Sequence, residues 1–439
     1  MKAPIYTLVA TTVVIGLAGC SAVQDDFEYP LHLAMASEGA SAPTTAVDPG
    51  NDAVYFSWFG KDEDGRPAVY AASSQRDDST ASTPVRVNPV DVSVNPHPQA
   101  PAQIAVSPEG AVYVAWSTRE EIPGRRFPAS NLMLAGSRDG GRTFQSPVFV
   151  NDDARGAPAG HTFHDLAIGP DGTIYVSWLD SREPETVHLA DEAGDSDYHH
   201  GDHDTADAHD SHSGHSTTDV RVARSTDGGQ TFSTGVVVAQ NTCQCCRTAI
   251  FIDNVGTVYL AWRQIYEDNI RDIAFASSSD GAHSFSEPTR VHTDGWKIEG
   301  CPHTGPSLAV GADGTIHVSW YTAADSTTGL RYAVSSDGGR HFTEPLALES
   351  GIPVASARLA VSNRIPVWVA WEDPRADQIS AAPAGGSPDN SDRKVTFAGS
   401  APAISVTDRV RSVVWQNKGG IEALVIRHSE TEPRPRPNV

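Results

Sequence analysis

The 439-residue sequence is poor in cysteine, lacks long hydrophobic runs and has few basic side chains for its acidic content. No segment after the first twenty residues approaches the ~18 apolar residues that a membrane-spanning helix needs. Lys and Arg number 32 against 55 Asp and Glu, a formal charge of −23 that argues against nucleic acid or anionic membrane surfaces as partners. No long stretch has a helical period, whereas Gly and Pro are plentiful, so we expect an all-β protein.

The amino terminus has the organisation of a secretion signal. A mostly apolar stretch over 6–17 is too short to span a bilayer, and it leads into Leu-Ala-Gly-Cys20. This ending resembles the lipobox of bacterial lipoproteins. The resemblance implies a signal peptide over 1–19, a lipid on Cys20, a tether over 20–30 and a place at the outer membrane facing the periplasm. A secretory signal with a chance cysteine is the alternative; both place the chain where disulfides persist.

A short strand pattern that ends in tryptophan recurs along the chain. Examples are AVYVAW at 111–116, TIYVSW at 173–178 and TIHVSW at 315–320. The tryptophans of all the copies are Trp58, Trp116, Trp178, Trp262, Trp320, Trp371 and Trp415. A turn such as PEG or PDG usually precedes the pattern, and another apolar run precedes the turn. Such repetition indicates a β-propeller whose blades each contain four strands.

A second motif follows the tryptophan strand in four repeats. Its copies are SRDGGRTF (137–144), STDGGQTF (225–232), SSDGAHSF (278–285) and SSDGGRHF (335–342). They resemble the Asp-box of sialidase-type, or BNR-repeat, propellers. In that turn Ser and Asp bond to local backbone groups, a glycine takes a positive φ and the aromatic ring packs under the blade. In the third copy Ala282 replaces the glycine. The motif indicates the fold rather than a catalytic activity.

We therefore expect a propeller over 31–439 with seven four-stranded blades; six blades is the alternative. The last repeat lacks a convincing fourth strand, which 31–37 would supply and so close the ring. Turns of an antiparallel blade alternate between two faces. The Asp-boxes then lie on one face. The crossings between blades and the loops after the tryptophan strands lie on the other, which we call the loop face.

Two neighbouring crossings on the loop face carry four of the five cysteines. NTCQCCRTA (240–248) contains Cys243, Cys245 and Cys246, and GCPHTGP (300–306) contains Cys301 and His303. Because the crossings belong to consecutive blade junctions, we expect these five side chains to meet near the mouth of the central channel. Histidines of other crossings, expected to be close enough to join them, are His97, His161 and His164.

The loop face also carries an insertion over 188–219 that is rich in histidine and aspartate. We expect this segment to be disordered and to collect metal ions weakly, because imidazole and carboxylate are ligands for Zn²⁺, Cu²⁺ and Ni²⁺. It resembles the His-Asp loops of periplasmic metal-handling proteins. Its candidate ligands are His199, His200, His203, His209, His212 and His215. A solvated acidic loop with incidental histidines is the alternative.

Disulfides, a metal site and a redox dithiol are the three interpretations of the cysteines. Cys245 and Cys246 are poorly placed to pair with each other, because a vicinal bridge strains the peptide between them. A C-x-C-C arrangement suits several thiolates around one soft ion, with copper ahead of zinc. The leading hypothesis is therefore metal handling or delivery outside the cytoplasm. The partners would be a transition-metal ion, the membrane through the lipid alone, and a periplasmic protein.

The Asp-boxes also raise a glycan-active, sialidase-like hydrolase as a second hypothesis, and a disulfide-braced interaction scaffold is the third. The resemblance implies three arginines that clamp a substrate carboxylate, one of them in an Arg-Ile-Pro motif of the first blade. Here that motif occurs only at 364–366, so the catalytic set is not carried over and an enzymatic role stays open. We interpret the arginines that follow tryptophan strands as ion-pair partners of neighbouring acids: Arg119, Arg182, Arg263 and Arg375.

Overall fold

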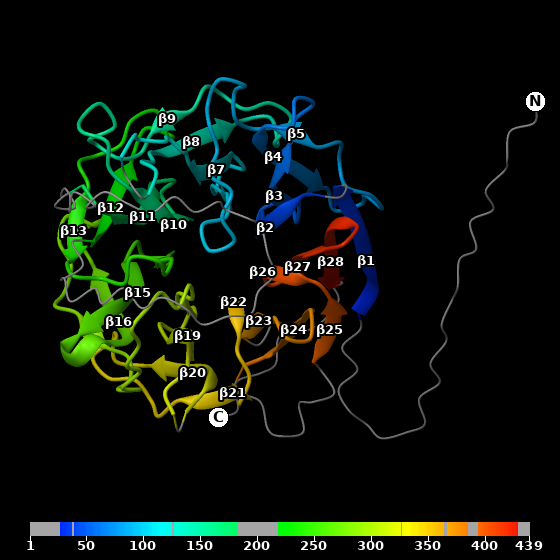
Figure 1. Ribbon diagram of the computed structural model, residues 1–439. Helices are drawn as coiled ribbons and strands as arrows, with labels where there is room; N and C mark the ends of the chain where they lie inside the picture. The colour runs from blue at the N-terminus through cyan, green and yellow to red at the C-terminus, as the bar shows by residue number, and fades with distance from the viewer. Residues whose placement is uncertain are drawn as a thin grey trace, which may run out of the picture.

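The computed structural model describes residues 27–36, 39–124, 127–182, 218–325, 327–363, 367–384 and 394–428. These residues form seven antiparallel sheets of four strands each. Figure 1 shows the sheets as blades that follow one another around a ring. The predicted seven-bladed propeller is confirmed, and the six-bladed alternative is wrong. Within the described ranges the one helix is the 3₁₀ turn η1 (Glu267–Asn269), and no helix there is long and apolar enough to cross a membrane.

The first three blades use their strands in chain order from the inside of the ring outward. Blade 1 contains β2 (Ser41–Val47), β3 (Val54–Lys61), β4 (Pro67–Ser74) and β5 (Val85–Arg86). Blade 2 contains β6 (Gln103–Val106), β7 (Val112–Ser117), β8 (Leu132–Ser137) and β9 (Val148–Phe149). Blade 3 contains β10 (His161–Ile168), β11 (Ile174–Asp180), β12 (Asp219–Ser225) and β13 (Val236–Ala239).

The next three blades repeat this order. Blade 4 contains β14 (Ala249–Ile252), β15 (Val258–Tyr266), β16 (Ile270–Ser278) and β17 (Thr289–Arg290). Blade 5 contains β18 (Ser307–Val310), β19 (Ile316–Thr322), β20 (Gly329–Ser335) and β21 (Leu346–Ser350). Blade 6 contains β22 (Ala355–Ala360), β23 (Trp368–Asp373), β24 (Gln378–Pro383) and β25 (Val395–Ala398).

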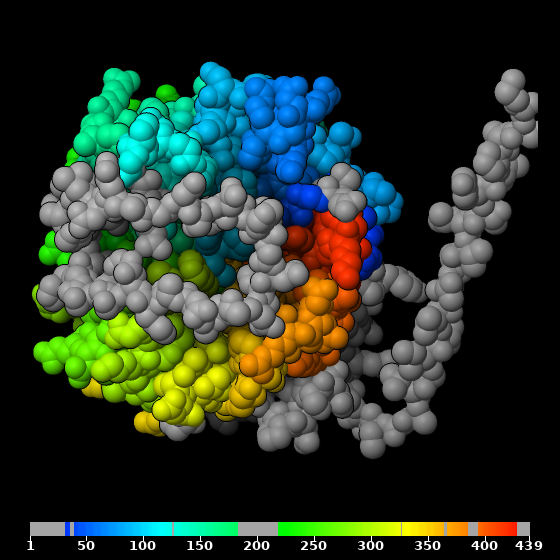
Figure 2. All heavy atoms as spheres, viewed as in Figure 1, coloured from blue at the N-terminus to red at the C-terminus, as the bar shows by residue number. Residues whose placement is uncertain are grey.

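The seventh blade joins the two ends of the chain. It contains β26 (Ser400–Val406), β27 (Val410–Asn417), β28 (Gly420–His428) and, outermost, β1 (Phe27–Ala36). β1 pairs antiparallel with β28, with Leu33 opposite Ala423, so the expected closure of the ring is confirmed. Figures 1 and 2 show the blue and red ends of the ring side by side. β1 begins at Phe27, inside the segment that we expected to be a tether.

The core is distributed between the blades. All seven repeated tryptophans lie on the second strand of a blade, and each is at most 3 % exposed. These strands are apolar on both sides because each sheet packs between two neighbouring sheets, as in the fully buried β7 and β11. Small polar side chains then fix one blade to the next: Ser57 Oγ donates to Ala102 O over 2.7 Å, and Ser177 bonds to Thr248 over 2.8 Å.

The four Asp-boxes form the expected turns between the third and fourth strands. In the first copy Gly141 N donates to Ser137 Oγ (2.9 Å) and Thr143 N donates to Asp139 Oδ1 (2.9 Å). Hydrogen bonds from Thr143 hold the pKa of Asp139 well below its usual range. Gly141 has a φ of 80°, and Ala282 adopts the same left-handed conformation with a φ of 62°. The turn therefore forms in the third copy without its glycine.

Bulges recur where inner strands begin, on the loop face. The register shifts in β2, β10, β22 and β26, and each shift contains one residue with a φ of about 50°. These residues are Ala42, Phe163, Ser356 and Ala401. A bulge bends a strand and changes which side chains face a neighbour. Side-chain directions at the channel mouth therefore depart from simple strand alternation.

Candidate metal centre

The first cysteine loop connects β13 to β14 and is fixed by backbone hydrogen bonds. Cys243 N donates to Arg263 O on β15 (3.0 Å), and Thr248 N donates to Phe163 O on β10 (3.1 Å). Cys246 N donates to Cys243 O (3.4 Å), so the three cysteines lie on one tight turn. Since its anchors belong to blades 3 and 4, the loop has a rigid frame.

The turn places three thiols together beneath the surface. Cys243, Cys245 and Cys246 are 0 %, 4 % and 1 % exposed, respectively. The Sγ atom of Cys243 lies 3.3 Å from that of Cys246 and 3.7 Å from that of Cys245. All four cysteines described here are free thiols. We call these three residues the inner group.

Cys301 and His303, which belong to the next blade junction, lie close to Cys245. Ligand atoms of Cys245, Cys301 and His303 all lie within 4.8 Å of one another, and Cys301 and His303 are exposed. We call these three residues the outer group; Cys245 belongs to both groups. The two cysteine loops touch at Gly305, where a Cβ atom would lie 2.1 Å from the carbonyl oxygen of Arg247. Only glycine allows this approach of the two loops.

Cationic side chains surround the inner thiols. Arg271 Nη1 donates to Cys243 Sγ over 3.4 Å, and the charge of Arg263 also acts on Cys243 and Cys246. Arg247, 1 % exposed and directly next to Cys246 in the chain, interacts electrostatically with that thiol. The Arg247 guanidinium donates to Gln99 Oε1 over 2.8 Å and to Ala357 O, and the charge of Asp165 acts on it more strongly than that of Cys246.

The four thiols of the two groups differ in pKa. Hydrogen bonds from the Cys245 and Cys246 thiols, reinforced by Arg271, hold the pKa of Cys243 well below its ordinary value. A hydrogen bond from the Cys245 thiol lowers the pKa of Cys301 to about 6. Donating these bonds raises the pKa of Cys245, and burial raises that of Cys246. A cation that binds the cluster must therefore displace protons from Cys245 and Cys246.

Arg263 is a structural brace, which contradicts the expectation that it pairs with a neighbouring acid. It is 1 % exposed and donates to three carbonyl oxygens, those of Thr304 (3.1 Å), Arg271 (2.6 Å) and Tyr321 (2.8 Å). Its guanidinium also lies over the ring of Trp296, 4.9 Å from the centroid. Arg263 thus ties β15 to the second cysteine loop and to β19.

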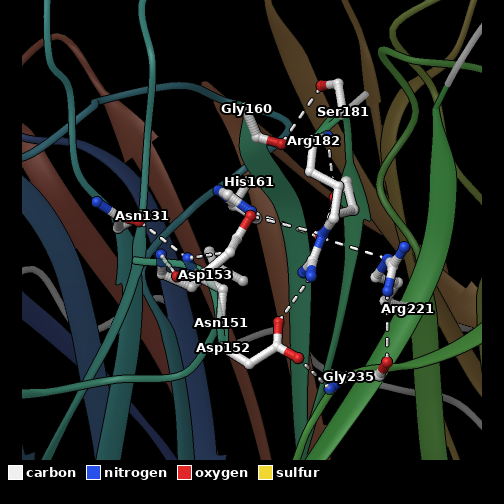
Figure 3. A network of polar contacts seen from close by, with 12 residues as sticks. Asn131, Asn151, Asp152, Asp153, Gly160, His161, Ser181, Arg182, Arg221 and Gly235 are labelled. Carbon is white, nitrogen blue, oxygen red and sulfur yellow. Dashed lines mark hydrogen bonds and ion pairs between the residues drawn. The ribbon is translucent and has the colours of Figure 1, made fainter. Parts of the chain in front are cut away.

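Two other arginines form the expected ion pairs. Arg119 contacts Glu121 over 2.5 Å, and Arg182 contacts Asp180 and Asp152 over 2.8 Å each. Figure 3 shows Arg182 within a polar network between blades 2 and 3. Both guanidiniums therefore bind carboxylates of the same chain.

His161 belongs to that network and not to the thiol groups (Figure 3). Its Nδ1 lies 2.6 Å from Ser130 O, and its Nε2 lies 3.0 Å from Asp153 and 3.5 Å from Asp180. Oxygen atoms of this network engage both ring nitrogens, and neither ligand group found among the described residues contains His161. The expectation that His161 joins the cysteines is therefore wrong.

His164 also lies outside the two thiol groups. It is fully buried, and its Nε2 lies 3.1 Å from Ala115 O on the neighbouring blade. Burial lowers its pKa to about 4, so the ring is neutral near pH 7. No candidate ligand group among the described residues contains it. His164 lies inside the bulge between Thr162 and Asp165, where the register shifts.

Several other predicted site residues lie outside the described ranges. They are Cys20 and the tract histidines His199, His200, His203, His209, His212 and His215. The Arg-Ile-Pro segment at 364–366 also lies outside them.

Sequence reasoning missed the arginines around the thiols. Arg271 lies on β16 opposite Ile265 of β15, two residues beyond Arg263. The β15–β16 hairpin register places both arginines toward the loop face, next to the crossing that carries Cys243. This hairpin register is the feature from which the position of Arg271 could have been predicted.

Comparisons with known proteins identify the fold. No family model and no curated protein sequence matches the chain. A PL25 ulvan lyase structure bound to -[GlcA(1-4)Rha3S]- is 12 % identical, with a TM-score of 0.51 over 90 % of this chain and 95 % of that one. The Hadza microbial sialidase Hz136 is 13 % identical (TM-score 0.48; 84 % and 74 % covered). A Penicillium chrysogenum α-L-arabinanase complexed with arabinobiose is 15 % identical (TM-score 0.48; 78 % and 97 % covered). The chain thus shares its β-propeller fold with the ulvan lyase.

Proposed function

We propose that this protein binds a soft transition-metal ion, copper(I) before zinc, at the inner group, and that it handles or delivers metal outside the cytoplasm. The observation that carries the proposal is the convergence of Cys243, Cys245 and Cys246 in one buried turn. Thiolates bound to one zinc ion at about 2.3 Å in tetrahedral geometry are about 3.8 Å apart. The separations of 3.7 and 3.3 Å between the Sγ atom of Cys243 and those of Cys245 and Cys246 are close to this value.

The surrounding charges also favour a thiolate centre. Three thiolates around a monovalent ion carry a net charge of −2, which must be compensated in a buried site. The positive charges of Arg271 and Arg263 act on these thiols. Sulfur ligands favour Cu(I), and three thiolates complete the coordination of this ion. A structural zinc site takes four ligands instead.

The cellular setting belongs to the same proposal. A lipid on Cys20 would hold the propeller at the outer membrane, facing the periplasm. The 188–219 tract would collect divalent ions weakly, and the buried thiols would retain an ion more tightly. A periplasmic protein is the expected recipient or donor of the metal.

The test is metal binding by reduced, full-length protein under anaerobic conditions. Elemental analysis of protein purified without added metal is combined with Cu(I) and Zn²⁺ titrations against a competing chelator. We expect a tight Cu(I) site that Cys243→Ser/Cys246→Ser removes. Cys20→Ala, which removes the one cysteine outside both groups, should retain it.

Disulfides are the contradicting outcome. If mass spectrometry of unreduced protein shows all four thiols of the two groups in disulfides, and reduction creates no tight site, the cysteines brace the loops and the metal proposal fails.

A glycan-active enzyme is the second candidate, and the solved structures with this fold favour it. The ulvan lyase, the sialidase and the arabinanase all act on glycans according to their descriptions. This chain has a small opening at the channel mouth, lined by Arg358, Ser356 and several prolines. The Arg358 guanidinium interacts electrostatically with Asp165, and it is the candidate partner for the carboxylate of an acidic sugar.

This candidate is tested by incubating the protein with a uronate-containing polysaccharide, an arabinan and a fluorogenic sialoside. Release of products that Arg358→Ala abolishes and Arg119→Ala leaves intact would establish it. No turnover of any of the three would exclude the activities of the named neighbours.

A further inference from the structure

The inner and outer groups cannot serve one ion together. Their five ligand atoms fall into two sets of three, each within 4.8 Å, and no larger set satisfies that limit among the described residues. Two atoms bound to one ion at about 2.3 Å can be at most about 4.6 Å apart. An ion among Cys243, Cys245 and Cys246 therefore leaves at least one of Cys301 and His303 out of its coordination sphere.

The residue common to both sets is Cys245. It is 4 % exposed, and it lies between the buried thiols and the exposed side chains of Cys301 and His303. A thiolate sulfur has more than one lone pair and can bind two soft ions at once. The same sulfur is therefore positioned to bridge two ions in adjacent sites.

We propose that the loop face takes two Cu(I) ions, one in the inner group and one in the outer group, with the Cys245 thiolate as the bridge. This inference rests on the proposed metal-binding function. Each ion then has three ligands: three sulfurs for the inner ion, and two sulfurs and an imidazole for the outer one. Three ligands satisfy Cu(I), whereas a structural Zn²⁺ site takes four, so the pair of three-ligand sites favours copper.

The net charge of the loaded cluster is modest. Four thiolates (−4) and two monovalent ions (+2) leave −2, and the positive charges of Arg271 and Arg263 act on the inner thiols. Exposure also differs between the sites. The outer site meets solvent through Cys301 and His303, whereas the inner site is buried, so an ion from outside meets the outer group first.

The contact between the two cysteine loops positions the ligands of the second ion. Gly305 permits that contact, and Gln244 Nε2 lies 3.9 Å from Cys301 Sγ across it. His303 has a φ of 48°, a conformation that non-glycine residues seldom adopt without an imposed constraint. The second loop is thus held in the position that brings Cys301 and His303 to Cys245.

The experiment is a Cu(I) titration of the reduced full chain against graded concentrations of a strong Cu(I) chelator, with native mass spectrometry to count ions. We expect two chelator-resistant ions per wild-type chain. Cys301→Ser should retain one, Cys246→Ser should retain one, and Cys245→Ala should retain none. His292→Ala, a histidine of the same crossing that pairs with Asp294, is the matched control and should retain two.

The outcomes separate the two proposals. No chelator-resistant ion in the wild type overturns the metal-binding function itself. A single resistant ion that survives Cys301→Ser overturns the second site and leaves the first. Two ions that persist in Cys301→Ser or in Cys245→Ala overturn the bridged arrangement. Near-ultraviolet circular dichroism of each variant verifies that the propeller is folded.

Discussion

Arg271 donates a hydrogen bond from Nη1 to the Sγ atom of Cys243 over 3.4 Å, although the two residues lie in different segments of the blade junction. The contact joins the β16 strand to the cysteine turn and places a fixed positive charge beside a buried thiol. It is one of the causes that hold the pKa of Cys243 below its ordinary value.

Arg271→Ala should raise the pKa of the Cys243 thiol and weaken Cu(I) binding by about 10- to 150-fold, since a hydrogen bond to a charged group contributes about 1.5–3 kcal/mol. Chelator competition at constant pH measures the affinity. Arg271→Lys keeps the charge and should recover part of the loss. Equal affinities for wild type and Arg271→Ala would show that this cation has no influence on the site.

Cys301 should be the most reactive thiol of the reduced, metal-free protein. Its pKa of about 6 makes it largely thiolate at neutral pH, whereas an ordinary cysteine with a pKa of about 8.5 is mostly protonated. Iodoacetamide labelling followed by peptide mapping should give a rate midpoint near pH 6. Cys245→Ala removes the hydrogen bond that lowers the pKa, so the midpoint should move to higher pH; an unchanged midpoint would contradict this cause.

Gly305→Ala should disrupt the outer group selectively. The added Cβ would meet the Arg247 carbonyl at 2.1 Å, so the two cysteine loops must separate. We expect the loss of one of two Cu(I) ions, counted by native mass spectrometry. Gly339→Ala on the opposite face is the control for general destabilisation and should keep both ions at a temperature where it is folded.

Gly339→Ala should be far more costly than Gly141→Ala, although both occupy the same Asp-box position. Both glycines have a φ near 80°, which costs a non-glycine residue about 1–2 kcal/mol. At Gly339 the Cβ would also lie 2.0 Å from a ring carbon of Phe275, whereas at Gly141 the nearest atoms are at 3.7 Å. Overpacking adds about 1–3 kcal/mol. Urea unfolding should reveal the difference, and equal losses would contradict it.

His164 should make stability fall in mild acid. Its folded-state pKa of about 4 lies below its ordinary 6.5, so between these values the unfolded chain binds a proton that the folded chain does not. Stability is therefore lost as the pH falls through this window, by about 2 kcal/mol between pH 7 and pH 5. Unfolding free energies of wild type and His164→Gln at both pH values test this. The variant should lose less, and identical losses would remove His164 as the cause.

The sequence alone determined the ring. The tryptophan strands and Asp-boxes recur at blade spacing, and alternation of turns between faces follows from antiparallel pairing, so seven blades, ring closure by β1 and the shared face of the cysteine loops were all predictable. These features depend on local and periodic patterns.

Only the tertiary structure decided which side chains meet. His161 and Cys301 both lie at blade crossings, yet His161 faces Asp153 while Cys301 reaches Cys245. A bulge follows His161 in β10, no bulge occurs in β18 after Cys301, and the approach at Gly305 depends on how two blades pack. The contact of Arg271 with Cys243 and the sharing of Cys245 are likewise set by contacts between residues distant in the chain, which no local pattern specifies.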